Sequence, residues 1–253
     1  MGMTMVAGII QARMGSSRLP GKVLLRAAGK TMFEHFVERV RRANTLDIVA
    51  LATTDRDIDD PLVALAKSIE LPVYRGSEGD VADRFYGAAT MLEADVVVRL
   101  LNDCPLLDPA VIDEIVGYFL SHRDEIDFIS NQYPHTYPDG MDVSAFSFEA
   151  LKKLHSLSYE PSHREHIVTG FWGMGDTFRW QNYYNRINLF REHRWTLDYP
   201  EDFELISAVL EALYSPDRLF TMQDVLDFLK SRPDLMELNR HHIPRGLKIS
   251  YTM

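Results

Sequence analysis

Short apolar segments and segments with helical spacing alternate along the first half of the chain. Strand-length runs of aliphatic and β-branched residues occur at 5–10, 48–53, 71–74 and 94–101. The stretch 31–40 instead spaces its apolar residues three and four positions apart, with charges on the opposite face, which predicts a helix. Another helix is predicted over 60–69, with Pro61 in its first turn. This alternation, which continues through residue 120, predicts a doubly wound α/β fold.

The middle of the chain, residues 126–180, breaks this rhythm. Two short strand-like runs, 128–131 and 143–146, flank a turn-rich and aromatic-rich stretch at 133–140. An excursion of this kind is either a lid over a site or a contact between subunits. Both interpretations stay open from the pattern alone.

The alternation returns after residue 190. Residues 194–199 predict a short strand that ends in an acidic turn, and a helix is expected to begin near Pro200. Two further helices are predicted around 208–214 and 221–229. The last third of the chain therefore continues the α/β pattern.

The composition narrows the function classes. With 253 residues, 46% of them hydrophobic, the chain can bury a large core, and no linker or repeat divides it. The formal net charge of −10 argues against a nucleic-acid partner, whose binding surface on the protein is normally basic. No apolar run approaches the roughly 20 residues of a membrane span. The single cysteine fits a reducing compartment, so we expect a cytoplasmic protein without a membrane partner.

A basic, glycine-containing loop follows the first predicted strand. It contains Gly15 and Gly21, which allow backbone N–H groups to turn toward an anion, and it lies where ligands bind in open α/β sheets. Arg13, Arg18 and Lys22 add three cations to the same loop, and a guanidinium group pairs with phosphate oxygens in a bidentate manner. The loop therefore predicts a polyphosphate ligand.

Two common phosphate-binding patterns do not fit this loop. The Walker A pattern has four residues between its glycines and a Ser or Thr after its lysine, whereas five residues separate Gly15 from Gly21 and Val23 follows Lys22. The dinucleotide pattern G-x-G-x-x-G is absent. The loop is therefore neither a Walker A loop nor a dinucleotide-binding loop.

Two aspartates are candidates for a metal site. Asp103 follows the run 94–101 directly, and Asp198 precedes the helix expected near Pro200. Taken singly, Asp103 could close a turn and Asp198 could cap a helix. Taken together with the basic loop they predict a Mg²⁺ site, because Mg²⁺ prefers one or two carboxylates with phosphate oxygens and water. Both side chains are expected to be exposed at the edge of the sheet.

Three motifs carry a resemblance to a known family. The run ARMGSSRLPGK at 12–22 resembles the signature loop of the sugar cytidylyltransferases that make CMP-3-deoxyoctulosonate and CMP-sialic acids. It is still more similar to the SpsF-like cytidylyltransferases, named for spore coat polysaccharide biosynthesis. The runs 99–109 and 194–202 are similar to the second and last motifs of this family, and the resemblance extends over about 5–238.

This resemblance implies a fold and an activity. The fold would be α/β, a Rossmann-like, glycosyltransferase-A-type nucleotidyltransferase fold with a mixed, mostly parallel sheet flanked by helices. Residues 1–253 would form one domain, with 126–180 as a small inserted β excursion serving as lid or dimer region. The implied activity is Mg²⁺-dependent transfer of CMP from CTP to a sugar hydroxyl, with release of pyrophosphate. The favoured acceptor is an acidic sugar for cell-surface polysaccharide, and the favoured assembly is a homodimer.

The resemblance also implies roles for individual residues. Lys22, Asp103 and Asp198 would be catalytic, with the two aspartates as the Mg²⁺ ligands. The residues that bind CTP would be Ala12, Arg13, Gly15, Ser16, Arg18, Lys22 and Arg75. The residues at the acceptor would be Asp142, Arg164 and His166. For Arg164 and His166 an exposed start of a helix is an equally good interpretation.

Alternative functions stay open. The relatives usually carry a glutamate where Ser144 stands, which leaves the identity of the acceptor open. The acceptor could be a polyol phosphate or a phosphonate, or the donor could be another nucleoside triphosphate, because the fold does not decide between them. A catalytically silent nucleotide-binding subunit is a further alternative, against which the retention of the three catalytic residues argues. A glycosyltransferase would normally show an Asp-x-Asp motif after the central strand, and only Asp103 is present there.

Overall fold

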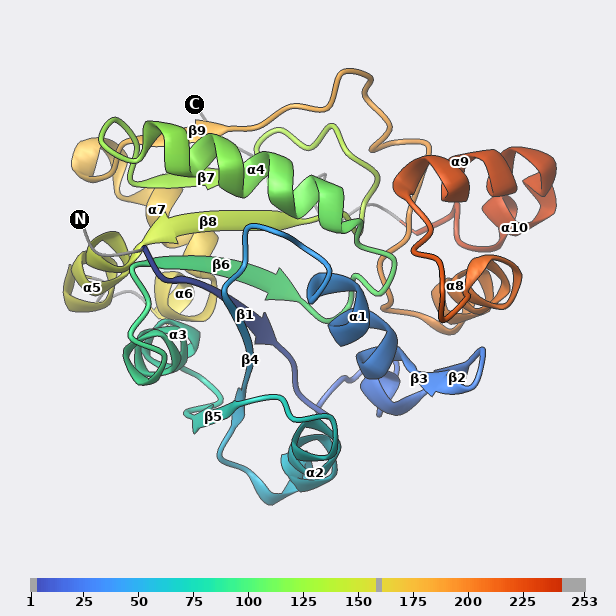
Figure 1. Cartoon of the computed structure of the whole chain (residues 1–253), viewed down its shortest axis with the longest axis horizontal. Helices are drawn as coiled ribbons and strands as arrows, with labels where there is room; N and C mark the ends of the chain where they lie inside the picture. The colour runs from blue at the N-terminus through green and yellow to red at the C-terminus, as the bar shows by residue number, and fades with distance from the viewer. Residues whose placement is uncertain (1–3, 158–160, 243–253) are drawn as a thin grey trace.

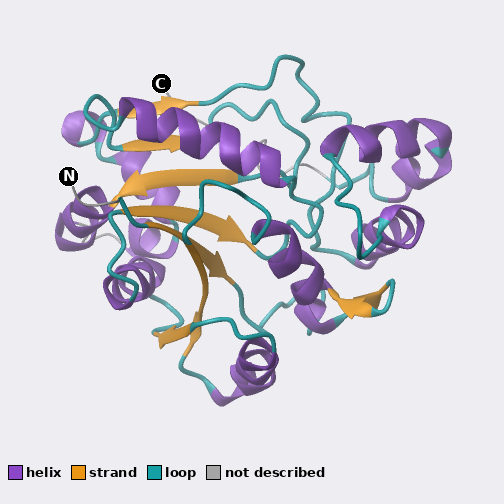
Figure 2. Ribbon diagram, in the orientation of Figure 1, coloured by secondary structure: helices purple, strands orange, loops and turns teal. Residues whose placement is uncertain are grey.

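In the computed structural model, residues 4–157 and 161–242 are described, and they form a seven-stranded sheet with helices on both faces (Figures 1 and 2). The strand order is β5-β4-β1-β6-β8-β7-β9. Strand β8 is antiparallel to both of its neighbours, and the other neighbouring pairs are parallel. The strands are β1 (Val6–Gln11), β4 (Ile48–Thr54), β5 (Val73–Gly76), β6 (Val96–Leu101), β7 (Phe128–Ser130), β8 (Val143–Ser147) and β9 (Trp180–Asn182), with a separate hairpin of β2 (Arg26–Ala27) and β3 (Lys30–Thr31).

The helices cover the two faces of the sheet and one of its ends (Figure 1). Side chains of α1, α2, α4, α8, α9 and α10 join one hydrophobic core, and those of α3, α5 and α7 join the other. The helices are α1 (Met32–Val40), α2 (Asp60–Ser68), α3 (Val81–Met91), α4 (Pro109–His122), α5 (Phe148–Leu157), α6 (Pro161–Glu165), α7 (Ile167–Gly173), α8 (Pro200–Leu213), α9 (Met222–Ser231) and α10 (Pro233–Leu238). None of these helices is long and apolar enough to cross a membrane.

The central strands supply both cores through their alternation. In β1, Val6 and Ile10 belong to one core while Ala7 and Ile9 belong to the other, as the two-residue period of a strand requires. Because both faces are covered by helices, the predicted strands read as almost continuous apolar runs. The prediction of a mostly parallel α/β sheet flanked by helices is confirmed.

Side chains cap the starts of α1 and α3. Thr31 accepts a hydrogen bond from the backbone N–H of Glu34 at 3.1 Å, while the Glu34 carboxylate accepts one from the backbone N–H of Thr31 at 2.7 Å. This reciprocal capping box begins α1 at the predicted position. At the start of α3, Asp80 accepts a hydrogen bond from the backbone N–H of Asp83 at 2.9 Å.

Three local predictions differ from the structure. The run 71–74 was expected to be a strand, but β5 begins at Val73. The strand predicted over 194–199 is wrong, because that segment forms an isolated bridge between Asp139 and Arg194 and joins no ladder among the described residues. Its backbone bonds to loops instead, as when Leu197 N–H donates to the Asp103 carbonyl at 2.7 Å. The helices expected near 200 and around 208–214 are one continuous helix, α8.

The register of the central strands places two loops side by side. Gln11, the last residue of β1, is level with Leu101, the last residue of β6, and the two strands are parallel. The basic loop after β1 and the segment Asn102 to Pro105 after β6 therefore leave the sheet at the same edge. The inserted region adds β7, β8 and β9 to the main sheet, so it extends the sheet and does not stand apart from it.

Candidate active site

A cavity of about 380 Å³ opens at the carboxyl ends of β1 and β6, within the size range of small-molecule sites. Its walls come from the basic loop, the start of α3, the segment after β6 and the turn before α8. The predicted residues that line this cavity are Ala12, Arg13, Gly15, Ser16, Arg18, Lys22, Asp103, His166 and Asp198. Residues from four separate parts of the sequence thus meet where the strand-end argument placed a ligand.

The basic loop is held in shape by a buried carboxylate and a glycine. Asp59, which is 1% exposed, accepts hydrogen bonds from the backbone N–H of Met14 at 2.7 Å and from Thr53 at 3.1 Å. Gly21 has a φ of +66°, a conformation that glycine adopts at little cost, and the short 3₁₀ helix Lys22–Leu24 begins directly after it. The turn at Gly21 brings Lys22 into the wall of the cavity.

Lys22 lies between the two candidate metal ligands. Its Nζ is 2.9 Å from Asp198 Oδ1 and 3.6 Å from Asp103 Oδ2, and it donates a hydrogen bond to the Leu197 carbonyl at 2.6 Å. The three side chains are mostly buried, with Lys22 at 13% exposure and Asp103 at 15%. Two carboxylates therefore face one cationic position at the edge of the sheet.

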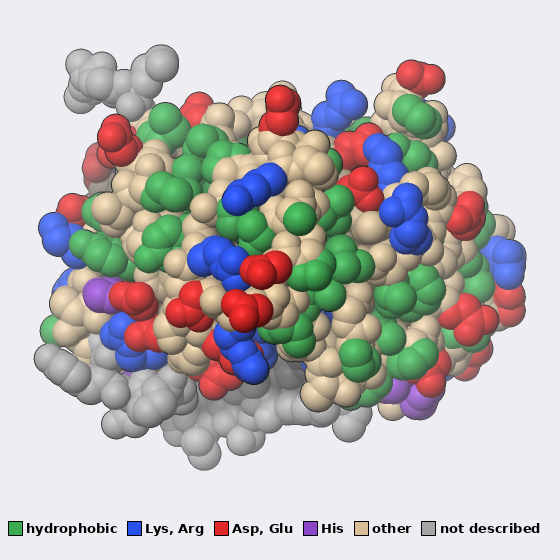
Figure 3. Space-filling view, turned by 90° about the horizontal axis from the view of Figure 1, so that it is seen from below, with side chains coloured by type: hydrophobic (Ala, Val, Ile, Leu, Met, Phe, Trp, Pro, Cys, Tyr) green, Lys and Arg blue, Asp and Glu red, His purple; other side chains and the backbone are tan. Residues whose placement is uncertain are grey.

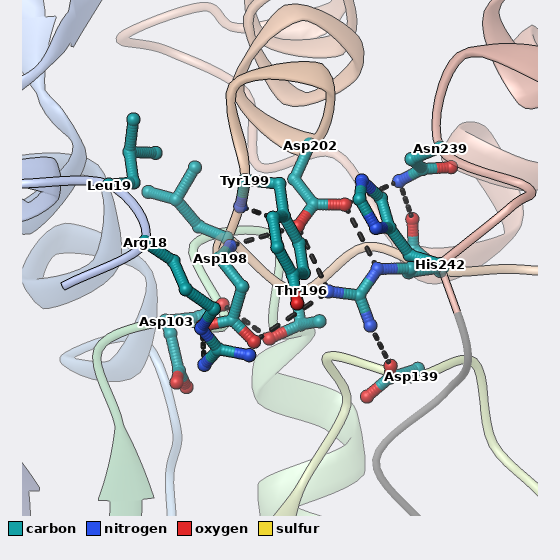
Figure 4. Close-up of polar contacts among 12 residues, drawn as sticks. Arg18, Leu19, Asp103, Asp139, Thr196, Asp198, Tyr199, Asp202, Asn239 and His242 are labelled. Carbon is teal, nitrogen blue, oxygen red and sulfur yellow. Dashed lines mark hydrogen bonds and ion pairs between the residues drawn. The ribbon is translucent and has the colours of Figure 1, made fainter. Parts of the chain in front are cut away.

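Asp198 is more enclosed than expected. Its side chain is 1% exposed, whereas the sequence predicted that both aspartates would be exposed. The reason is a ring of cations. Arg18 lies 3.0 Å from Oδ1 of Asp198 (Figure 4), Lys22 Nζ lies 2.9 Å from the same oxygen, and Arg194 lies 3.6 Å from Oδ2. The prediction of exposure is wrong for both aspartates, because the Asp103 side chain is also only 15% exposed.

Arg194 is the centre of the network that holds Asp198. It pairs with both oxygens of Asp202 at 3.0 Å and with Asp139 at 2.9 Å. Asp202 also accepts from the backbone N–H of Asp198 at 2.9 Å, and Asn239 donates to Asp202 at 2.8 Å. Burial alone would lower the pKa of Arg194, but its hydrogen bonds to Asp202 and the surrounding carboxylates raise that pKa overall.

A close backbone contact explains how the segment before α8 reaches Asp103. Gly140 has a φ of +109°, and a Cβ at this position would lie 2.7 Å from the carbonyl carbon of Trp195. Only glycine permits this approach, and Trp195 N–H then donates to the Asp139 carbonyl at 2.6 Å. Two residues further on, the bond from Leu197 N–H to the Asp103 carbonyl brings Asp198 beside Asp103.

The two arginines at the mouth of the cavity differ in their ion pairs. Arg13 is 3.1 Å from Glu78, and both side chains are partly exposed, at 45% and 35%. An exposed pair of this kind contributes little stability, so the Arg13 guanidinium group can exchange its partner for a ligand. Arg18 is itself 42% exposed, but its partner Asp198 is buried. The Glu78 carboxylate also pairs with Arg56 at 2.5 Å.

Three predicted residues do not line the cavity. Arg75, on β5, bonds to the Thr54 carbonyl at 3.0 Å and to Asp60 at 2.7 Å. Arg164 pairs with Asp80 at 2.5 Å, although its neighbours Glu165 and His166 do line the cavity. The roles expected of Arg75 and Arg164 stay predictions.

Asp142 is the third of these residues. It is 8% exposed and lies in the loop before β8, where its Oδ1 is 3.8 Å from Nε2 of His135. Burial lowers the pKa of His135, although the Asp142 charge acts in the opposite direction. The acceptor role expected of Asp142 stays a prediction.

Sequence reasoning missed several residues of the cavity wall, most notably Arg84. This arginine is 2% exposed, and its pKa is lowered by burial and then by the charge of Arg13. Its Nε has no hydrogen-bond partner among the described residues. An arginine inside the apolar face of α3 was the available signal. Arg84 adds a fourth cation to a cavity in an acidic chain.

One face of the molecule has a mixed charge. On the face shown in Figure 3, acidic and basic side chains are interspersed with hydrophobic ones, and the described residues there form no continuous basic surface. The cavity is lined by four cationic side chains, Arg13, Arg18, Lys22 and Arg84, which could attract a polyanion.

Comparison with known proteins agrees with this geometry. Residues 7–215 match the family model described as cytidylyltransferase. The chain is 30% identical to the spore coat polysaccharide biosynthesis protein SpsF of Bacillus subtilis over 234 residues, 89% of this chain and 94% of SpsF. It is 36% identical to the 3-deoxy-manno-octulosonate cytidylyltransferase of Trichlorobacter lovleyi over 117 residues, 46% of each chain.

A solved structure extends the likeness to the whole fold. A cytidylyltransferase from Leptospira borgpetersenii superimposes with a TM-score of 0.88 at 32% identity, covering 95% of this chain and 99% of that one. The resemblance to the SpsF-like cytidylyltransferases and the nucleotidyltransferase fold that it implied are thereby confirmed. The chain belongs to the cytidylyltransferase family and is a nucleotidyltransferase.

Proposed function

We propose that this enzyme is a Mg²⁺-dependent cytidylyltransferase that transfers CMP from CTP to the hydroxyl of an acidic sugar and releases pyrophosphate. The observation that carries the proposal is the meeting of Lys22, Asp103 and Asp198 with the basic loop at one cavity. The similarity to SpsF and to a 3-deoxy-manno-octulosonate cytidylyltransferase supports the donor and the class of acceptor.

The residues present fit a magnesium ion. Asp103 and Asp198 each direct an oxygen toward the single cation Lys22 Nζ, so the pair already forms a cation-binding position built from oxygens. Mg²⁺ prefers such carboxylates together with phosphate oxygens and water. A bound Mg²⁺ would lower the pKa of the attacking hydroxyl and offset charge on the α-phosphate.

The chain's own residues would bind and orient the triphosphate. Arg13 would leave its partly exposed partner Glu78 for phosphate oxygens, with which a guanidinium group forms bidentate bonds. The exposed guanidinium group of Arg18 would contact the triphosphate beside its buried partner Asp198. Lys22 would stabilise the leaving pyrophosphate as the bond between the α-phosphorus and the bridging oxygen breaks. The acceptor oxygen forms the new bond to the α-phosphorus, and its proton passes to solvent. Positioning and electrostatics supply most of the rate enhancement in such a transfer.

The acceptor would lie on the His166 side of the cavity. His166 and Glu165 line this wall, and Arg164 and Asp142 lie outside the present cavity. An acidic sugar brings a carboxylate, which the cations of this cavity would attract. A role in cell-surface polysaccharide synthesis, a homodimer and a cytoplasmic location belong to the same proposal, and the likeness to SpsF supports the first of them.

The proposal is tested by pyrophosphate release in a grid of nucleotides and acceptors. The full chain is incubated with each nucleoside triphosphate, with and without Mg²⁺, and with acidic sugars, polyol phosphates or phosphonates. We expect release with CTP, Mg²⁺ and an acidic sugar, and loss of release in Lys22→Met but not in the exposed control Lys153→Met. Preference for another nucleotide, for a phosphorylated acceptor, or release without a divalent metal would contradict the proposal.

A further inference from the structure

A second group of possible metal ligands lies at the start of α8, beyond Tyr199. Glu201, His241 and His242 each offer one ligand atom, and these atoms all lie within 4.8 Å of one another. The group uses imidazole nitrogens, unlike the oxygen pair of Asp103 and Asp198. Figure 4 shows His242 beside Tyr199.

The ring of His242 is held in place before any metal binds. It stacks on Tyr199 with ring centroids 3.8 Å apart and an angle of 7° between the ring planes. Its Nε2 is 3.3 Å from Oε2 of Glu201, so the nitrogen that would bind a metal already faces the carboxylate. The His241 ring lies close by, with its centroid 4.1 Å from that of His242.

The chemistry of these ligands selects one class of metal. Imidazole and carboxylate together suit Zn²⁺ and similar transition metals, whereas Mg²⁺ prefers oxygen ligands. Three protein ligands and a water would complete a tetrahedral zinc site.

The distances require only a small adjustment. Zinc–nitrogen bonds of about 2.0–2.1 Å place tetrahedral ligands roughly 3.4 Å apart, which is closer than the widest separation in this group. His241 is exposed and Glu201 lies at the surface, so both side chains can move by about an ångström without disturbing the core. His242, which is fixed by its stacking, would supply the anchor.

We propose that Glu201, His241 and His242 bind a zinc-class divalent metal at a site distinct from the Mg²⁺ position. Such a metal would cross-link His241 and His242, which follow α10, to Glu201 in the first turn of α8. Tyr199 lies between this site and the catalytic network, because it contacts both His242 and the guanidinium group of Arg18, the latter 5.1 Å from the ring centroid. The bound metal would therefore support the turn that carries Asp198.

The test is a titration of the full chain with Zn²⁺, and with Co²⁺ as a spectroscopic probe, in the absence of nucleotide. We expect saturable binding of one equivalent, with the visible spectrum of tetrahedral Co²⁺. Glu201→Gln and His241→Ala should each weaken metal binding at least about tenfold. Replacing a residue that only hydrogen-bonds to a metal ligand already lowers metal affinity by that factor, and these two residues would be ligands themselves. Both residues are accessible at the surface, so these variants test the site without the loss of folding that replacing His242 could cause.

Two control variants make the result specific. His122→Ala removes a histidine on α4, and Asp103→Asn removes a ligand of the proposed Mg²⁺ position, so both should bind Zn²⁺ as the unmodified chain does. No saturable binding would overturn the inference. Equal binding by the unmodified chain, Glu201→Gln and His241→Ala would also overturn it, because the metal would then sit elsewhere.

Discussion

Replacement of Arg194 by methionine tests the buried network that positions Asp198. The Arg194 side chain is 6% exposed and contacts Asp139, Asp198 and Asp202, whose side chains are each at most 1% exposed. Methionine would fill much of the volume but leave three buried carboxylates without their shared cation. Removing one partner of a buried ion pair costs about 3–5 kcal/mol, because the remaining charge is left uncompensated. We expect a loss in the free energy of unfolding of at least that size.

Such a loss is large compared with the usual stability of a protein, which is about 5–15 kcal/mol. In a chain of this length each kcal/mol lowers the melting temperature by roughly 2–4 °C, so the variant should melt about 6–20 °C lower. Urea unfolding followed by circular dichroism gives the free energy, and calorimetry gives the melting temperature. Arg179→Met, which removes an exposed pair with Asp127, is the matched control and should change little.

A loss below about 1 kcal/mol in Arg194→Met would refute this reasoning, because it would put the cost within the range of an exposed pair. A second variant, Arg194→Lys, separates charge from geometry. Lysine keeps the positive charge but cannot form the bidentate contact with Asp202. The free energy of unfolding of Arg194→Lys should therefore lie between those of the unmodified chain and Arg194→Met.

Two further predictions concern charge at the site and in the core. Asp103→Asn and Asp198→Asn should each abolish Mg²⁺-dependent turnover. Only Asp198→Asn should also lower the urea midpoint of unfolding, because three cations surround Asp198. Unchanged turnover in either variant would contradict the metal site formed by the two aspartates. Burial lowers the pKa of His35 and His135 in the folded chain. As the pH drops below about 6.5, the two histidines therefore become protonated in the unfolded chain before they do so in the folded chain. The free energy of unfolding should fall over this range, down to the pKa values of the folded state. In urea unfolding at several pH values, His135→Gln should reduce the change in the free energy of unfolding with pH. The same pH dependence in His135→Gln and in the unmodified chain would contradict this prediction.

The parts of the fold that depend on local pattern were predictable from the sequence. Strands β1 and β6 read as short apolar runs because helices cover both of their faces, and the capping box at Thr31 and Glu34 marks the start of α1. The position of Asp103 followed from the strand that precedes it. The strand predicted over 194–199 failed because apolar residues also occur in an extended segment that bonds to loops and joins no sheet.

The contacts that complete the site could not be predicted, because they join residues far apart in the chain. Asp198 meets Asp103 through a bond between Leu197 and the Asp103 carbonyl, and no local pattern encodes that pairing. Arg194 and Asn239 enter the network for the same reason. Arg75, which was expected to bind CTP, contacts Asp60 and backbone carbonyls on β5, and its role stays a prediction.

The most direct test of the proposed site is thermal stabilisation by each of the four nucleoside triphosphates, with and without Mg²⁺. A ligand at about 100 times its dissociation constant adds roughly 2.7 kcal/mol to the stability of the folded chain, which calorimetry readily detects. The proposed function predicts that CTP stabilises most. The two aspartates beside Lys22 predict that Mg²⁺ enhances the effect and that Asp103→Asn loses the enhancement. Equal stabilisation by all four nucleotides, or no effect of Mg²⁺, would contradict it.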